Sequence, residues 1–142
     1  RVSMATREEK AEYARRWRER HPERCRESRQ AWKENNPAHY LFHKARARAK
    51  QKGLEFDLTI EWAQERLDLG RCEVSHLPFD YDLGTFAKAN PWSPTIDRRD
   101  PAVGYIMENC RLVVWAYNAA KNSWSDEVVL ELAEALTTEV VE

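Results

Sequence analysis

The segments SPTIDRRDP (residues 93–101), NCRLVV (109–114) and NAAK (118–121) decide the fold of this chain. The first predicts a short strand that ends in an acidic cluster, and the Asp-Pro pair with the glycine after it predicts a turn. The second segment alternates well enough to form the returning strand, and helical spacing continues over residues 115–123. The predicted order is therefore strand, loop, strand, helix.

This order predicts a site for a hard divalent cation. Asp97 stands at the end of the first strand, and Asn118 stands on the helix that follows the second. The two side chains can face each other across a small gap, and carboxylate and amide oxygens are ligands that such cations prefer. An internal ion-pair network, with asparagines that cap turns, would explain the same residues without a metal.

These segments resemble those of the HNH endonucleases, and more closely a branch carried by phages and bacteria with a Ser-Pro-x-x-Asp-Arg-x-Asp-Pro signature. The resemblance covers residues 46–142. It implies an α+β fold built on a ββα-metal finger, a strand, strand, helix unit that holds one metal ion against a scissile phosphate. To this core the sequence adds a basic helical N-terminal arm and a C-terminal packing helix.

The resemblance also implies roles for individual residues. Asp97 matches the first metal ligand, Asn118 the second, and Asn109 the asparagine that braces the loop. The implied cofactor is one Mg²⁺ or Mn²⁺ ion. Arg98 stands where the better-known pattern has its histidine general base. Many HNH proteins also bind a structural zinc through four cysteines; here only Cys72 has a counterpart, so we expect no structural zinc.

The general base is therefore open. His76, in a predicted turn, is one candidate because imidazole accepts a proton near neutral pH, although a structural role in the turn explains this histidine somewhat better. Asp100 is a second candidate, and water activated by the metal alone is a third. Arg98, Arg99 or Lys121 would offset charge in the transition state, because a guanidinium or ammonium group can hold phosphate oxygens.

Charge is distributed unevenly along a chain whose net charge is −1. Residues 1–53 hold sixteen Lys or Arg and seven Asp or Glu, whereas residues 54–142 hold seven and seventeen. A basic segment joined to an acidic body is typical of a protein that grips a polyanion. We therefore predict a DNA-binding arm at residues 1–53 and an HNH-like nuclease domain at residues 54–142. The predicted DNA contacts are Arg15, Arg16, Arg18, Lys44, Arg46, Arg48, Lys50, Arg99 and Lys121.

Prolines and caps predict the remaining elements. The repeated segments RWRERHP (residues 16–22) and AWKENNP (31–37) indicate two similar helices, each ended by a proline that can begin the next. The predicted helices lie near residues 5–20, 23–35, 38–51 and 60–67, with a final helix capped by Ser125. Further predicted strands lie at residues 54–58 and 71–74.

Composition limits the class of protein. A chain of 142 residues fits one compact domain with an arm, and no segment is apolar for long enough to cross a membrane. The three cysteines form no paired framework, which favours a reducing compartment. We therefore expect a protein of the cytoplasm, in a bacterium or a phage-infected cell, whose partner is DNA and not a membrane.

Three functions remain open at this point. The first is a metal-dependent endonuclease that acts on DNA. The second is a catalytically silent DNA-binding module on the same scaffold, and the third is an interaction protein whose acidic C-terminal helix and basic arm bind other proteins. A single metal finger cuts one strand at a time, so double-strand cleavage would need a homodimer or successive cuts.

Overall fold

The computed structural model describes residues 4–84 and 88–141. Contacts between elements divide the chain into two compact units, Arg1–Asn35 and Asn36–Glu142. The third helix, which sequence analysis assigns to the arm, belongs to the second unit by its contacts.

The first unit consists of α1 (Arg7–Arg20) and α2 (Pro22–Asn35). A capping box begins α1: the Thr6 hydroxyl accepts from the Glu9 amide, and the Glu9 carboxylate accepts from the Thr6 amide. Pro22 is the first residue of α2, as expected for a proline that starts a helix. Neither of these fully described helices buries a side chain, which agrees with the few apolar residues in their sequences.

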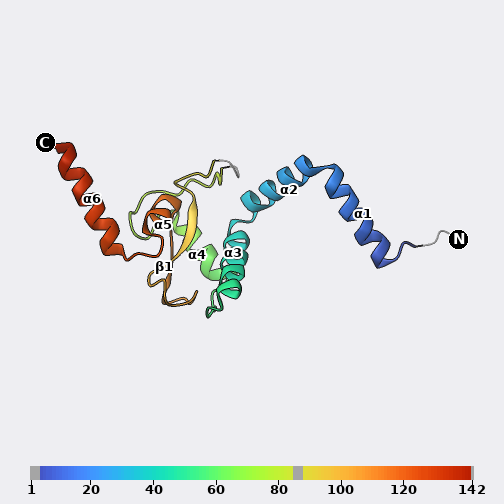
Figure 1. Ribbon diagram of the computed structural model, residues 1–142, viewed down its shortest axis with the longest axis horizontal. Helices are drawn as coiled ribbons and strands as arrows, with labels where there is room; N and C mark the ends of the chain where they lie inside the picture. The colour runs from blue at the N-terminus through green and yellow to red at the C-terminus, as the bar shows by residue number, and fades with distance from the viewer. Residues whose placement is uncertain (1–3, 85–87, 142) are drawn as a thin grey trace. The chain divides into compact units, whose positions relative to one another are not determined.

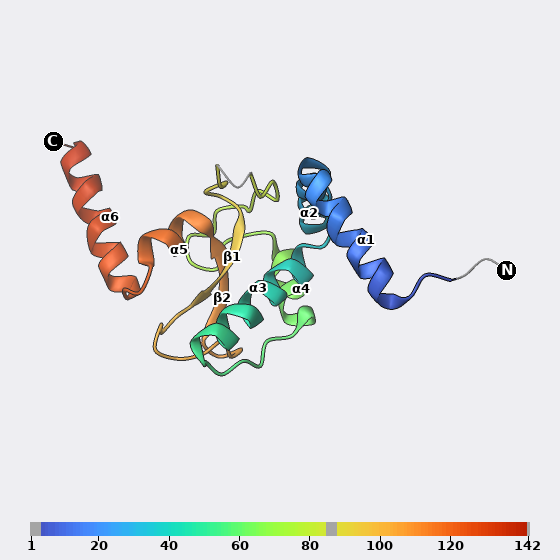
Figure 2. The same cartoon turned by 45° about the vertical axis from the view of Figure 1, so that its right-hand side comes forward.

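Two helices build one side of the second unit. α3 (Pro37–Lys52) buries Ala38, Leu41, Ala45 and Ala49, a stripe at helical spacing, and packs on α4 (Ile60–Leu69) (Figure 2). Gly53 ends α3 in the left-handed conformation with φ of 65°. The Thr59 hydroxyl caps α4 by accepting from the Trp62 amide at 3.0 Å. Local sequence signals thus fix where both helices begin or end.

A two-stranded sheet forms the other side. β1 (Pro94–Arg98) and β2 (Cys110–Val114) are antiparallel, with Asp97 opposite Arg111. α5 (Trp115–Lys121) follows β2 directly and packs on both strands, as Figure 1 shows. All five residues of β2 are buried, because this strand contacts α4 as well as α5. The fold is therefore α+β, as predicted.

The predicted strand at residues 54–58 is wrong. This segment makes a single parallel bridge, between Phe56 and Tyr105, in place of a strand. The loop after β1 passes so close that a Cβ on Gly104 would lie 2.4 Å from the Glu55 carbonyl oxygen. The Tyr105 amide can therefore donate to that oxygen at 2.8 Å. Residues 54–58 thus pair with the loop after β1 and not with another strand.

The predicted strand at residues 71–74 is also wrong. The chain there forms a tight turn in which the Cys72 amide donates to the Leu77 carbonyl at 2.8 Å and the His76 amide donates to the Cys72 carbonyl at 3.0 Å. Cys72 and Cys110 are both buried and unpaired. Burial, with the nearby Asp97 charge, raises the pKa of Cys110 to about 12. These two thiols are therefore core residues.

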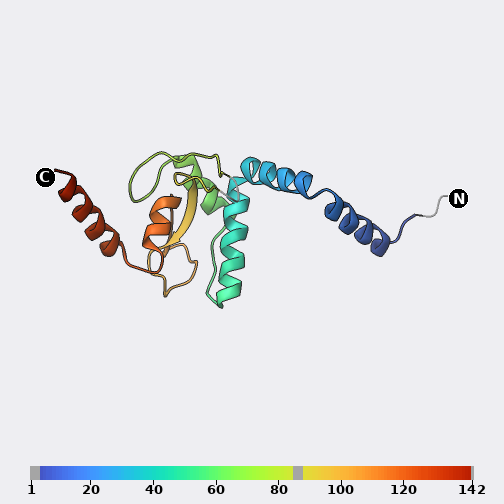
Figure 3. The ribbon, with the colours of Figure 1, turned by 45° about the horizontal axis from the view of Figure 1, so that its top comes forward.

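The final helix, α6 (Asp126–Val141), corrects the expectation of a packing helix. Figure 3 shows it leading away from α5 and the strands. Four of its described apolar side chains are about half exposed, and α5 is the element with which it makes several contacts. The exposed residues are Val128, Leu130, Leu132 and Leu136. No helix within the described residues is both long and apolar enough to cross a membrane.

Candidate functional site

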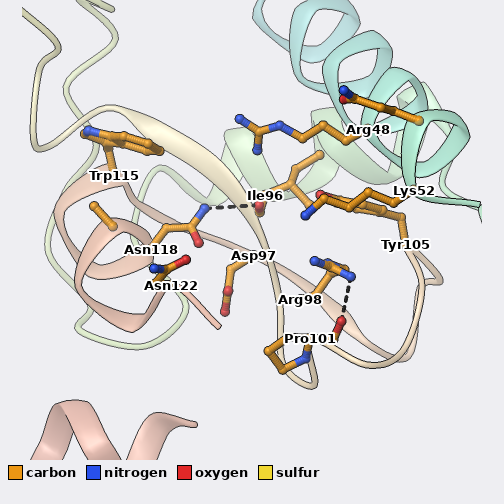
Figure 4. Close-up of a pocket in the computed structure, with 12 residues that line it drawn as sticks. Arg48, Lys52, Ile96, Asp97, Arg98, Pro101, Tyr105, Trp115, Asn118 and Asn122 are labelled. Carbon is orange, nitrogen blue, oxygen red and sulfur yellow. Dashed lines mark hydrogen bonds between the residues drawn. The ribbon is translucent and has the colours of Figure 1, made fainter. Parts of the chain in front are cut away.

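A pocket of about 470 Å³ lies between α3, β1, the loop after β1 and α5, entirely within the second unit. Figure 4 shows Arg48 and Lys52 on α3 at one side of it, with Asn118 and Asn122 on the side of α5. The charged and amide side chains in its lining are Arg48, Gln51, Lys52, Asp97, Arg98, Asn118 and Asn122. The pocket therefore brings together three predicted site residues from β1 and α5.

Asn109 holds the loop between the two strands. Its Nδ2 donates to the carbonyl oxygens of Asp100 and Gly104, both at 3.0 Å, and its Oδ1 accepts from the Asp100 amide at 3.0 Å. Its own carbonyl accepts from the Arg99 amide at 2.7 Å. Because these bonds join the start of β2 to the residues after β1, they fix the backbone where β1 ends.

Asp97 belongs to a buried group of charges. It is 3% exposed; its Oδ2 accepts from Arg111 Nε at 3.0 Å and its Oδ1 accepts from Lys121 Nζ at 3.1 Å. Lys121 is fully buried and also donates to the Arg98 carbonyl oxygen at 2.7 Å. Each carboxylate oxygen of Asp97 therefore has one cationic partner. A carboxylate offers about four lone-pair positions, so further positions remain for a ligand.

The same group extends to the start of α6. Arg111 Nη2 donates to Asp126 Oδ1 at 2.5 Å, and the Tyr117 hydroxyl donates to the same oxygen. Burial opposes ionisation of Asp126, but the bonds from Arg111 and Tyr117 outweigh it and lower the pKa of Asp126. Burial also opposes charge on Arg111, whereas its bonds to Asp126 and Asp97 raise its pKa. We call Asp97, Arg111, Lys121 and Asp126 the buried charge cluster; two cations balance two carboxylates in it.

Asn118 turns its amide oxygen away from the strand. Its Nδ2 donates to the Ile96 carbonyl oxygen and to Thr95 Oγ1, both at 3.3 Å. A carbonyl only accepts, so the amide nitrogen must be the group on that side. Figure 4 shows Nδ2 of Asn118 directed at Ile96 and Oδ1 directed elsewhere. No described residue is hydrogen-bonded to this oxygen, which is therefore available to a ligand.

Asn122 is a pocket residue that sequence analysis missed. It caps the C-terminal end of α5 with φ of 47° and ψ of −120°, a positive-φ conformation outside the left-handed helical region. It follows Asn118 by four residues, and this spacing, which brings two helical side chains together, was the available signal. Its pocket position depends on where α5 ends, which the sequence leaves undefined.

The oxygen atoms that line the pocket meet part of the coordination requirement of a hard, largely hydrated cation. Asp97, Asn118 and Asn122 offer the oxygen ligands that suit Mg²⁺ and Mn²⁺. Among the residues that the structure describes, no three or more His, Cys, Asp or Glu side chains form a group that could hold a metal. Since Mg²⁺ normally keeps several waters, one carboxylate with amide oxygens is compatible with weak binding.

Three cations of the pocket, which we call the cationic wall, have no carboxylate partner within the described structure: Arg48, Lys52 and Arg98. Arg98 is nevertheless held in place. Its Nη1 donates to the Pro101 carbonyl at 2.8 Å, and its guanidinium lies 5.0 Å from the centre of the Tyr105 ring. Nη1 also donates to the Val103 carbonyl at 3.3 Å, so Nε and Nη2 are held in position with no hydrogen-bond partner among the described residues.

Several predicted site residues lie outside the pocket lining. His76 is an exposed turn residue with φ of 62°. Asp100 accepts from the Ala102 amide at 2.9 Å through Oδ1, which shapes the loop. Arg99 is exposed beside it. Lys121, expected at DNA, is instead enclosed in the buried charge cluster, so its ammonium group does not reach the surface in this structure.

The basic residues of α3 and α1 that were predicted to contact DNA have different surroundings in the structure. Of those on α3, Arg48 alone lines the pocket, while Arg46 and Lys50 are exposed and Lys44 lies over the Tyr40 ring. Those on α1 are exposed, and two of them already have acidic partners within the helix. The pairs are Arg15 with Glu12, Arg15 with Glu19 and Arg16 with Glu12, whereas Arg18 is in no such pair.

Comparison with known proteins gives one informative match. No family model matches the chain, and no curated protein does. A solved structure of the rare-cutting HNH restriction endonuclease PacI matches it with a TM-score of 0.53 and 16% sequence identity, over 72% of this chain and 78% of that one. At this identity the likeness concerns the fold alone. The chain is therefore similar in fold to an HNH restriction endonuclease.

Proposed function

We propose that this chain is a divalent-metal-dependent endonuclease that hydrolyses phosphodiester bonds of DNA in the pocket between α3, β1 and α5. One observation carries the proposal: the pocket combines oxygen ligands, Asp97 and Asn118, with three cations that lack carboxylate partners. Metal-dependent phosphodiester hydrolysis needs both kinds of group. The fold shared with an HNH restriction endonuclease supports the same reaction class.

In this proposal Asp97 and Asn118, with Asn122 beside them, hold one Mg²⁺ or Mn²⁺ ion. When bound, such an ion polarises the phosphate and offsets the charge of the leaving oxygen. Arg98 binds phosphate oxygens; its guanidinium stays protonated, so it cannot replace a histidine base. No histidine lines the pocket in the described structure, and the proposal therefore includes no imidazole base.

One pocket per chain cuts one strand. We therefore expect the primary product from supercoiled plasmid to be the nicked circle, with linear DNA only from a homodimer or a second cut. The N-terminal helices and the exposed basic residues of α3 would add contacts to neighbouring phosphates, which bring affinity without sequence preference.

A catalytically silent DNA-binding module is the second candidate. The observation that favours it is the pairing of both Asp97 oxygens with Arg111 and Lys121, which competes with a metal ion for this carboxylate. Under this alternative the cationic wall would still bind phosphate. DNA binding is thus common to both functions, and cleavage separates them.

Plasmid nicking tests the proposal. The full chain is incubated with supercoiled plasmid in Mg²⁺, in Mn²⁺ and in EDTA, beside Asp97→Asn and a matched control, Asp68→Asn. Asp68 is an exposed residue of α4 whose change removes the same charge. We expect nicking only with metal, a loss of about 100-fold or more in Asp97→Asn because a metal ligand is removed, and no loss in the control.

Because Asp97 is buried, the fold of Asp97→Asn is checked by circular dichroism before its activity is interpreted. Equal nicking by wild type and a folded Asp97→Asn would remove Asp97 from the mechanism. Metal-independent DNA binding with no nicking in either metal would establish the silent module instead.

A further inference from the structure

The charge balance of the pocket bears on the order in which ligands bind. Asp97 is the single carboxylate in the described lining, and Arg111 and Lys121 already neutralise it from behind. The remaining charges of the lining are those of Arg48, Lys52 and Arg98. The pocket of the free protein is therefore positively charged, although it carries the proposed metal ligands.

The position of two wall residues near a helix end needs a separate explanation. Cations in the last turns of a helix are favourable on their own, because they interact with the helix dipole. Lys50, which is exposed and lies outside the pocket, would interact with the helix dipole equally well. Arg48 and Lys52, four residues apart on one side of α3, instead line the same pocket as Arg98. Three cations from two elements thus converge on one space.

We propose that this pocket is a phosphate site in the free protein: Arg48, Lys52 and Arg98 bind a DNA phosphodiester without metal, and the divalent cation is held only together with that phosphate. The second half rests on the proposed function. A dication that enters the empty pocket meets three like charges and a carboxylate that is already paired. A phosphodiester offsets that charge and adds oxygen ligands, which Mg²⁺ commonly takes from substrate phosphates.

Arg98 would give the bound phosphate a defined orientation. Its bond to the Pro101 carbonyl and its contact with the Tyr105 ring hold the guanidinium before any ligand arrives. A planar guanidinium can bind two phosphate oxygens at once, whereas the Lys52 ammonium acts as a point charge. Arg98 would therefore orient the phosphate beside Asp97 and Asn118, while the two residues of α3 draw the strand toward the pocket.

Metal-free DNA binding tests the phosphate site. The affinity of the full chain for a short fluorescent DNA duplex is measured by anisotropy in EDTA over a series of salt concentrations. The double variant Arg48→Ala with Lys52→Ala is compared with Arg71→Ala with Lys88→Ala, which removes the same two charges from exposed positions outside the pocket and outside the predicted DNA contacts. We expect the pocket variant to bind DNA about tenfold more weakly than wild type. The slope of log affinity against log salt concentration should become shallower by about one for each phosphate contact that is lost, and the control should lose less than about threefold in affinity.

Binding of Mn²⁺ tests the coupling to metal. Free Mn²⁺ is followed by its paramagnetic resonance signal in titrations of the protein alone, the duplex alone and the two together. We expect the mixture to bind more Mn²⁺ than the two separate components combined, and the excess to be lost in the Arg48→Ala with Lys52→Ala variant. Equally tight Mn²⁺ binding by the protein with and without DNA would overturn the coupling.

The outcomes separate this inference from the proposed function. If the chain never nicks DNA but binds it without metal through Arg48 and Lys52, the nuclease proposal fails and the phosphate site stands. If the chain nicks DNA and both double variants bind it equally well, the phosphate site is overturned and the nuclease proposal stands.

Discussion

Residues next to each other on β1 take part in two groups of charges that are organised in opposite ways. Asp97 points into the buried charge cluster, where every cation has a carboxylate partner. Arg98 belongs to the cationic wall, where none of the described cations has one. Both residues nevertheless line the same pocket, so one strand brings the two groups together there. We interpret the balanced charges as part of what holds the fold, and we propose the unbalanced ones as the place where an outside anion binds.

The N-terminal unit sharpens this distinction. Arg15 and Arg16 pair with glutamates of their own helix. To contact phosphate they must exchange those partners, so a count of arginines overstates the charge that α1 offers to DNA. The expected effect of a substitution falls from the buried charge cluster, through the Asn109 side chain that holds the loop, to the N-terminal unit.

Asp97→Ala should have the largest effect. It leaves Arg111 and Lys121 buried without their partner, and breaking a buried ion pair in this way costs about 3–5 kcal/mol. Urea denaturation followed by circular dichroism measures the change in the free energy of unfolding. Asp97→Asn, which keeps the shape and an acceptor oxygen, should lose less. A loss below about 1 kcal/mol in Asp97→Ala would contradict the buried charge cluster as a structural unit.

Asn109→Ala should come next. The amide makes hydrogen bonds to the backbone of Asp100 and Gly104, and removing it leaves these groups without partners, at a cost of about 2 kcal/mol. Thermal unfolding measures the loss, and DNA nicking should fall with it because the end of β1 is no longer fixed. The comparison is Asn90→Ala, which changes a less buried loop asparagine whose side chain makes two hydrogen bonds to the backbone. Equal loss in the two variants would show that no special brace exists at Asn109.

Asp126→Asn should have a smaller effect that depends on pH. The folded protein lowers the pKa of Asp126, so its contribution to stability is present above the pKa of the unfolded chain and is lost as pH falls through the folded value. Because the side chain is 34% exposed, we expect about 1 kcal/mol at neutral pH. The difference between wild type and variant in urea denaturation should shrink toward zero below about pH 4. A difference that is constant from neutral to acid pH would contradict an ionised Asp126.

Replacement of Arg15, Arg16 and Arg18 by glutamine should have the smallest effect. Glutamine keeps the helix propensity of α1 while removing three charges, two of them already paired. DNA binding should weaken by less than about tenfold, with a shallower salt dependence. Anisotropy across a salt series measures both quantities. An unchanged salt slope would remove the N-terminal unit from the DNA interface.

Local signals made much of the fold predictable. Pro22 and Pro37 begin helices, Thr59 caps one, and Gly53 ends one in the conformation that glycine adopts most readily. The segment at residues 54–58 has the alternation of a strand, but no strand within the described residues pairs with it. Its single bridge to the loop at Tyr105 depends on tertiary contacts that the sequence pattern does not contain.

The sequence predicted two polar residues that line the pocket, but not how the charges around them are arranged. Spacing and resemblance pointed to Asp97 and Asn118, which do line one pocket. A lysine in the last turn of a helix ordinarily lies in solvent, and Lys121 is buried only because Asp97, 24 residues earlier, lies opposite it. Lys52 enters the pocket because α3 packs on β1, a contact between distant parts of the chain.

Crystals of the full chain with a short DNA duplex and Mn²⁺ offer the most direct test of a metal-dependent nuclease site. We predict an anomalous difference peak bounded by the Asp97 carboxylate, the Asn118 amide oxygen and a DNA phosphate that Arg98 also contacts. A phosphate bound by the cationic wall with no anomalous peak beside it, and with Asp97 still held by Arg111 and Lys121 alone, would contradict the account.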